Sequence, residues 1–127
     1  MEATCREAKA QGLERLGLFG TRFTMQARFY SDVFSKAGIV LIVPAADEQA
    51  YIHEKYMNEL VNGIIRPETR EQLLAVVDRL TVQERIQGLV LAGTELSLTL
   101  RDVTERDIPF LNTTEIHVNA AVAELLS

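Results

Sequence analysis

The sequence predicts a single α/β domain of three layers (αβα), in which helices cover both faces of a short, mostly parallel four-stranded sheet. Short apolar runs alternate along the chain with longer stretches of helical periodicity, and this alternation is typical of βαβ units. The apolar runs contain few polar side chains, as expected for parallel strands that are covered on both faces. A chain of 127 residues can bury a core of its own, and we find no internal repeat or linker. Residues 1–127 are therefore interpreted as one domain.

Four segments carry the strand pattern. The run at residues 39–43 reads Ile-Val-Leu-Ile-Val, is rich in β-branched side chains, and is ended by Pro44. The other predicted strands are residues 15–20, 88–92 and 108–111.

Two helices are predicted in the first third of the chain. Residues 1–14 are rich in Ala, Glu and Lys and contain Gly12 near their end. Residues 21–37 form a second helix that stops at Gly38. Its apolar face consists of Phe23, Ala27, Tyr30 and Phe34.

Three further helices follow. The first is capped by Asp47 and closed by Gly63, the second begins at Pro67, and the last begins near Thr114. Each carries apolar side chains on one face. These are Ile52, Tyr56 and Leu60, then Leu73, Val77 and Leu80, and finally Val118, Ala121, Val122 and Leu125.

Charge and composition argue against several classes of protein. Thirteen Lys and Arg residues stand against 18 Asp and Glu, giving a net charge of −5, and no basic cluster suggests a nucleic-acid partner. The longest apolar run, residues 39–46, is too short to span a bilayer, and the start carries no signal-peptide pattern. We therefore expect no membrane segment and a cytoplasmic location. Cys5 is the single cysteine, which leaves no internal disulfide and no cysteine cluster for zinc.

Candidate ligand-binding residues follow the predicted strands, because open α/β sheets bind ligands outside the carboxyl ends of their strands. Residues 20–24 place Thr21 and Thr24 in a glycine turn that leads into a helix N-terminus, which suits a carboxylate or a phosphate. The alternative is that either threonine only caps its own helix. The loop has neither the Walker A ending nor the glycine triplet of a dinucleotide-binding loop.

Two further loops are expected at the same edge. Residues 92–95 bring Thr94 and Glu95 to the end of a buried strand, where they would meet a small ligand or simply form a turn with an N-cap. Residues 112–115 follow the last strand and include Thr113.

The sequence contains two histidines. His117 follows the last of these loops. It is interpreted as an acid, as a partner for a carboxylate, or as an ordinary polar residue of a helix face. His53 lies beside Glu54 on a helix, with no second metal ligand at a useful spacing, and is interpreted as exposed to solvent.

The loops together are similar, in order and spacing, to the aspartate/glutamate racemase family over nearly the whole chain. The resemblance implies a fold of two similar α/β domains that face each other with the substrate between them. It also implies that catalysis needs neither pyridoxal phosphate nor a metal, and that one cysteine thiol from each domain removes or returns the α-proton. The motifs that carry the resemblance are Gly-Leu-Phe-Gly-Thr-Arg-Phe-Thr-Met at 17–25, Gly-Ile-Ile-Arg at 63–66, Gly-Leu-Val-Leu-Ala-Gly-Thr-Glu-Leu at 88–96, and Thr113-Thr114 with His117.

The chain departs from the family pattern in two respects. It resembles only the second half of such an enzyme, so we expect the first domain and its cysteine to be absent. The family's other cysteine precedes a Thr-Glu pair, and that position is Gly93 here, which cannot accept a proton. Cys5 matches no family motif. Glu95 remains as a surrogate base, with no acid opposite it.

From the resemblance we expect a racemase-like domain that is inactive alone, uses no cofactor, and keeps either a site for a small carboxylate or amino acid or a role in assembly. The apolar face of the last helix favours a homodimer, because a bare apolar stripe promotes association. The alternative is one half of a split racemase, completed by a separate N-terminal-domain chain or by dimerisation. The residues implied to bind the ligand are Thr21, Thr24, Thr94, Glu95, Thr113 and His117.

Overall fold

Four parallel strands form the central sheet of the protein, in a computed structural model that describes residues 2–100 and 108–126. The sheet order is β2-β1-β3-β4, and all three strand pairs are parallel. In chain order the elements are α1 (Glu2–Ala10), β1 (Arg15–Phe19), α2 (Arg22–Gln26), α3 (Arg28–Lys36), β2 (Val40–Ile42), α4 (Ala46–Asn58), the 3₁₀ helix η1 (Leu60–Asn62), α5 (Pro67–Gln83), β3 (Gly88–Leu91), α6 (Thr94–Thr99), β4 (Phe110–Asn112) and α7 (Thr113–Leu126).

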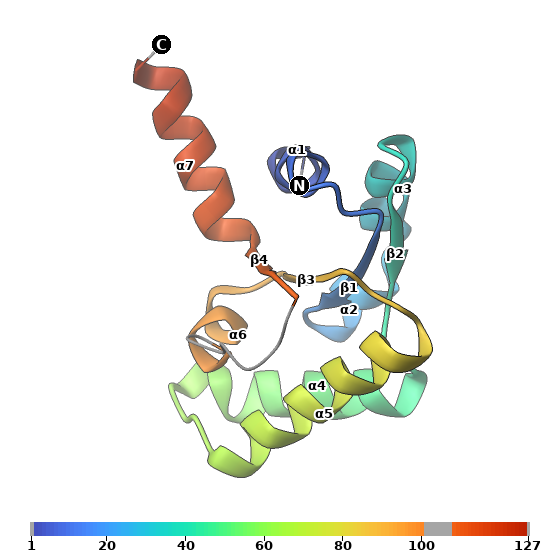
Figure 1. Cartoon of the computed structure of the whole chain (residues 1–127). Helices are drawn as coiled ribbons and strands as arrows, with labels where there is room; N and C mark the ends of the chain where they lie inside the picture. The colour runs from blue at the N-terminus through green and yellow to red at the C-terminus, as the bar shows by residue number, and fades with distance from the viewer. Residues whose placement is uncertain (1, 101–107, 127) are drawn as a thin grey trace.

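Helices cover both faces of this sheet. Figure 1 shows α4 and α5 along one face and α1 and α3 on the other, with α7 beside α1 and its far end pointing away from the sheet. This arrangement confirms the three-layer α/β prediction. Parallel strands need crossover connections, and the helices between them supply these.

Each face of the sheet has its own apolar core, because the side chains of successive strand residues point to opposite faces of the sheet. On the α4 and α5 face the core is built from Phe19, Ile52, Leu73, Val77, Leu80, Leu89 and their neighbours. On the α1 and α3 face it is built from Cys5, Ala8, Leu16, Leu18, Phe34, Ile39, Val90 and Leu111.

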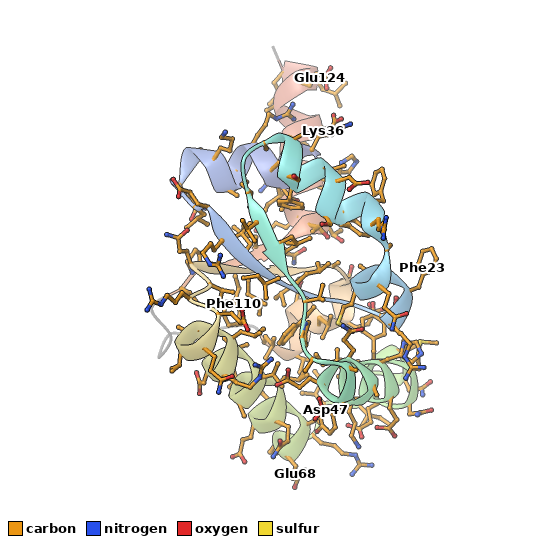
Figure 2. The ribbon with its side chains drawn as sticks, turned by 90° about the vertical axis from the view of Figure 1, so that its right-hand side faces the viewer. Phe23, Lys36, Asp47, Glu68, Phe110 and Glu124 are labelled. Carbon is orange, nitrogen blue, oxygen red and sulfur yellow. The ribbon has the colours of Figure 1, made fainter. Side chains whose placement is uncertain are left out.

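The single helix predicted at residues 21–37 is wrong, since the chain forms α2 and α3 with a break at Ala27. Ala27 has an extended conformation (φ −75°, ψ 128°). Met25 packs into the core on the α4 side, whereas Phe34 packs into the core on the α1 side. One straight helix cannot serve both faces, so the break lets the chain change face. Phe23, predicted on the apolar face, is 82% exposed and points outward in Figure 2.

The strand predicted at residues 39–43 is shorter and more exposed than its sequence suggests. β2 covers three residues and lies at the edge of the sheet, where β1 pairs with it. Val40 is 51% exposed, so the uniformly apolar run does not reflect burial on both faces. The other three strands are found where they were predicted, within two residues at either end.

Two helix starts also differ from the prediction. Asp47 does not cap α4; the helix starts at Ala46, and the Glu48 carboxylate accepts a hydrogen bond from the Ala45 N–H at 2.9 Å. The short helix α6 was not predicted, and Thr94 and Glu95 lie in its first turn instead of in a loop.

The last helix has its predicted bounds, but none of its described residues is buried. Val118 is 51% exposed, Val122 is 48% exposed and Leu125 is 86% exposed. Contacts with α1 and β4 hold α7 near the body of the domain. Within the described residues, no helix is both long and apolar enough to cross a membrane.

Candidate functional site

The loops predicted to bind a ligand meet at the carboxyl edge of the sheet. β1 and β3 are paired as far as Phe19 and Leu91, and the Ala92 N–H donates to the Phe19 carbonyl at 2.9 Å. β3 and β4 are paired as far as Leu91 and Asn112. The residues that follow these three strands therefore lie along one edge, where ligands bind in folds of this class.

Thr21 and Thr24 form a hydroxyl pair at the end of β1. Their Oγ1 atoms lie 3.2 Å apart, and Thr21 Oγ1 accepts a hydrogen bond from the Thr24 N–H at 3.4 Å. Thr21 is therefore the N-cap of α2, as the alternative interpretation proposed. Gly20 is needed beside them, because a Cβ there would lie 2.9 Å from Thr24 Cγ2.

Threonine side chains also connect the ends of β3 and β4. The Oγ1 atoms of Thr94 and Thr114 lie 3.5 Å apart, and Thr113 Oγ1 donates to the Leu91 carbonyl at 3.3 Å. The Asn112 side chain accepts from the Glu115 N–H at 3.1 Å and so caps α7. The hydroxyl of Thr113 thus has a partner in the protein, while Thr94 and Thr114 are exposed.

Helix α4 reaches both loops through two side chains that sequence reasoning did not assign to the site. His53 Nδ1 accepts a hydrogen bond from the Arg22 N–H at 2.9 Å, and the Tyr56 hydroxyl donates to Glu95 Oε2 at 2.7 Å. The two residues are three apart, which puts them on one face of the helix. The prediction that His53 is solvent-exposed is wrong, since it is half-buried and bonded to the loop after β1. The sequence gives no signal for either role, because both side chains come from the middle of a helix and reach the edge through tertiary packing.

Gly93 lies against the ring of Tyr56. A Cβ on Gly93 would clash with the Tyr56 hydroxyl and would lie 2.9 Å from Cε2 and 3.1 Å from Cζ. The backbone at Gly93 has φ +156°, a conformation that residues with side chains rarely adopt. Both observations fit a glycine at this position and no larger residue.

The hydrogen bond between Tyr56 and Glu95 shifts the pKa values of the two side chains in opposite directions. Burial, together with the hydrogen bond to Glu95, raises the pKa of Tyr56 to about 12. The hydrogen bond from Tyr56 and one from its own backbone N–H lower the pKa of Glu95. At neutral pH the pair is therefore a neutral phenol and an ionised carboxylate.

His117 and Cys5 lie away from this pair. His117 is exposed on α7 and lines a groove of about 570 Å³ with residues of α1 and α3, including Arg6 and Val33. Cys5 is 6% exposed in the core beneath α1, and burial raises the pKa of its thiol. A buried thiol with a raised pKa is a poor nucleophile or base, so Cys5 is a core residue and not a catalytic thiol.

The Gly63–Arg66 motif forms the turn between η1 and α5. Gly63 has a left-handed conformation (φ 76°) and caps η1. Next to it the buried Glu59 accepts from Thr69 Oγ1 at 2.7 Å and pairs with Lys55 at 3.0 Å, with Arg66 at 3.8 Å. The bonds from Thr69 and Lys55 lower the pKa of Glu59. The bonds of Glu59 to Thr69, Lys55 and Arg66 stabilise the turn between η1 and α5. All three partners belong to the protein, so this cluster is interpreted as structural.

The described part of the edge thus offers hydroxyl groups and the carboxylates of Glu95 and Glu115. Residues 2–100 and 108–126 contain no group of three His, Cys, Asp or Glu residues that could hold a metal ion. Hydroxyls and a carboxylate can bind a small polar molecule through hydrogen bonds and charge.

Comparison with known proteins shows the family to which this chain belongs. The model of the family described as Asp/Glu/Hydantoin racemase matches residues 1–121. The chain belongs to this family. Its similarity to the family therefore extends from α1 through the strand-end loops and into α7.

Solved structures show the same fold. A candidate Asp/Glu racemase from Yersinia pestis is 33% identical, with a TM-score of 0.90 over 99% of this chain and 54% of that one. An aspartate racemase homologue from Pyrococcus horikoshii OT3 is 24% identical, with a TM-score of 0.93 over 99% of this chain and 54% of that one. An aspartate racemase from Picrophilus torridus is 20% identical, with a TM-score of 0.58 over 87% of this chain and 44% of that one. This chain spans about half the length of these relatives.

Proposed function

We propose that this racemase-family domain binds a small amino acid or carboxylate at the carboxyl edge of its sheet and does not racemise it alone. The observation that carries this proposal is Gly93, which the resemblance aligns with a catalytic cysteine. Glycine has no group that accepts a proton, and Tyr56 occupies the space beside it. Removal of an α-proton needs a positioned base, so binding without catalysis is the function that these residues support.

The hydroxyl groups at the strand ends support the binding part of the proposal. Thr94 and Thr114 are exposed, and Thr21 and Thr24 are half-buried at the end of β1. Glu95 contributes the charge. We propose the same six ligand-binding residues as the sequence predicts, with His117 placed further from the others along α7.

The binding site can be tested by ¹H–¹⁵N NMR titration of the chain with L-aspartate and L-glutamate. The proposal predicts chemical-shift changes concentrated in residues 20–24, 92–95 and 112–115. Shifts confined to other parts of the chain, or no shifts at millimolar ligand, would contradict it. Gly12 and its neighbours, at the opposite end of β1, provide an internal reference.

A second candidate is one half of a racemase whose other half comes from a partner chain or from a second copy. One observation favours it: the described residues leave an apolar face of α7 uncovered, which includes Val118 and Val122. The test mixes a first domain of a family member with the double variant Gly93→Cys/Tyr56→Ala, in which removal of the ring makes room for the new side chain. Circular dichroism first establishes that the double variant is folded. Racemisation that needs both chains would support the split enzyme, and its absence would favour the binding domain.

A further inference from the structure

Strand β2 leaves one edge of the sheet open. We infer that a second copy of this chain pairs with β2 in antiparallel orientation, about a two-fold axis at Leu41, so that two four-stranded sheets join into one. The contact uses neither α7 nor the loops after β1, β3 and β4, and it goes beyond the proposed function.

The open edge is apolar and uncovered. β2 is the outermost strand beside β1, and Figure 2, which views the molecule from this side, shows no described helix across it. Val40 is 51% exposed and Val43 is 37% exposed. Residues 39–43 contain no charged side chain, although edge strands commonly carry charges that prevent pairing with another chain. The edge is therefore open to a further strand.

The backbone of β2 presents hydrogen-bonding groups on its outer side. The Val40 N–H donates to the Glu14 carbonyl at 2.8 Å, so the backbone groups of Val40 point toward β1. Neighbouring residues of a strand direct these groups to opposite sides, and those of Leu41 therefore point away from β1. Two copies of Leu41, placed opposite each other, can exchange two N–H to carbonyl hydrogen bonds.

The side chains of β2 also match a second copy of themselves. A two-fold axis at Leu41 places Val40 opposite Ile42 of the second copy, and Ile39 opposite Val43. Each cross-strand pair is apolar, because the run reads Ile-Val-Leu-Ile-Val. Such pairs stabilise antiparallel strands.

Charges beyond the two ends of β2 complement each other under the same axis. Lys36 ends α3 before the strand and Asp47 lies in the first turn of α4 after it, and both are exposed. Figure 2 shows the two residues beyond opposite ends of β2. Antiparallel pairing brings Lys36 of each copy to the end at which Asp47 of the other copy lies, whereas parallel pairing would bring like charges together. This complementarity identifies the second copy as the occupant of the edge.

The association is tested in the Val122→Glu variant, because the added charge opposes any contact through α7. Sedimentation equilibrium at low salt should show dimers with a dissociation constant on the order of 0.1–1 mM, since two three-residue strands bury little surface. Val40→Lys in this variant should abolish the dimer, because a lysine on an edge strand blocks pairing. Val82→Lys, at an exposed position of α5, adds the same charge and should leave the dimer unchanged.

A charge exchange tests the predicted orientation. Lys36→Glu places like charges at both ends of the paired strands and should weaken the dimer at least about fivefold. The double variant Lys36→Glu/Asp47→Lys restores opposite charges and should return the dissociation constant to within about twofold of its starting value. Circular dichroism of each variant establishes that it is folded.

Amide hydrogen exchange measured by NMR locates the contact on the strand. The Leu41 N–H should exchange at least about twofold more slowly at about 1 mM protein than at about 0.05 mM, because the dimer protects it. The Val40 N–H is the internal control, since its bond to Glu14 lies within one copy.

Three results would overturn the inference. The first is a monomeric mass for Val122→Glu at about 1 mM protein. The second is a dimer that persists in Val40→Lys, which would form through another surface. The third is a dimer that the charge exchange neither weakens nor restores, which would lack the antiparallel orientation. None of these results bears on the proposed ligand site.

Discussion

The Tyr56 hydroxyl occupies the space that a side chain on Gly93 would need. The two residues are 37 positions apart in the chain, on α4 and at the end of β3, and the ring of one packs on the backbone of the other. This contact joins Gly93, the residue at the family's cysteine position, to helix α4. Consequently, the effect on stability of a substitution at one position should depend on the residue at the other.

Gly93→Ala should destabilise the protein by about 3 kcal/mol, because backbone strain and a steric clash combine. Gly12→Ala is a matched control: its φ is +73°, yet nothing lies within 4 Å of the added Cβ. We expect the control to cost about 1–2 kcal/mol, from the left-handed backbone alone. Urea unfolding measures both, and equal losses would contradict the packing of Tyr56 on Gly93.

Combining Gly93→Ala with Tyr56→Ala tests the coupling directly. The second change removes the ring that the added Cβ would meet, so the double variant should lose less stability than the sum of the single variants. A difference of at least about 1 kcal/mol is expected for residues in contact. Additive losses in the urea curves would show that the two positions act independently.

Burial on α5 predicts different costs for two chemically identical changes. Val77 is fully buried in the core, whereas Val82 on the same helix is 78% exposed. Val77→Ala should cost about 2 kcal/mol, from lost burial and the cavity left behind. Val82→Ala should change the free energy of unfolding by less than about 0.5 kcal/mol. Similar values for the two would argue against the packing of α5 on the sheet.

Acid should weaken the protein partly through Glu59. Its pKa in the folded state lies below the ordinary value of 4.5, so its bonds to Thr69 and Lys55 contribute stability above pH 4.5 that is lost as pH falls through the folded pKa. Glu59→Gln should make the free energy of unfolding less dependent on pH below 4.5. The measurement is denaturant unfolding from pH 7 to pH 3, and an unchanged slope would contradict this role.

The apolar face of α7 predicts self-association. If a second copy covers Val118 and Val122, light scattering at tens of micromolar protein should give the mass of a dimer, and Val122→Glu should return it to a monomer. Val82→Glu, on an exposed position of α5, should leave the mass unchanged. A monomeric mass for the wild-type chain would count against the homodimer.

Periodicity predicted most of the fold because the apolar runs and the glycine stops determine it locally. The prediction of one helix over residues 21–37 failed, because nothing in this stretch of sequence marks the break at Ala27. The break follows from the packing of Met25 and Phe34 on opposite faces of the sheet. Periodicity also overestimated β2, since an apolar run does not reveal that a strand lies at the edge.

The candidate site was predictable only in part. Residues that directly follow the strands could be placed at one edge by topology, and Thr94 and Glu95 are found there. Tyr56 and His53 could not, because they come from the middle of a helix and reach the edge through tertiary packing. A buried tyrosine on an apolar face gives no sign in the sequence that its hydroxyl meets a carboxylate 39 residues away.

The claim of binding without catalysis is tested most directly by proton NMR of L-aspartate in D₂O with the purified chain. We predict that the α-proton signal keeps its intensity overnight while the ligand lines broaden on addition of protein. A sample without protein controls for spontaneous exchange. Loss of the α-proton signal in the presence of the chain would contradict the account, because it would require a base other than a thiol at position 93.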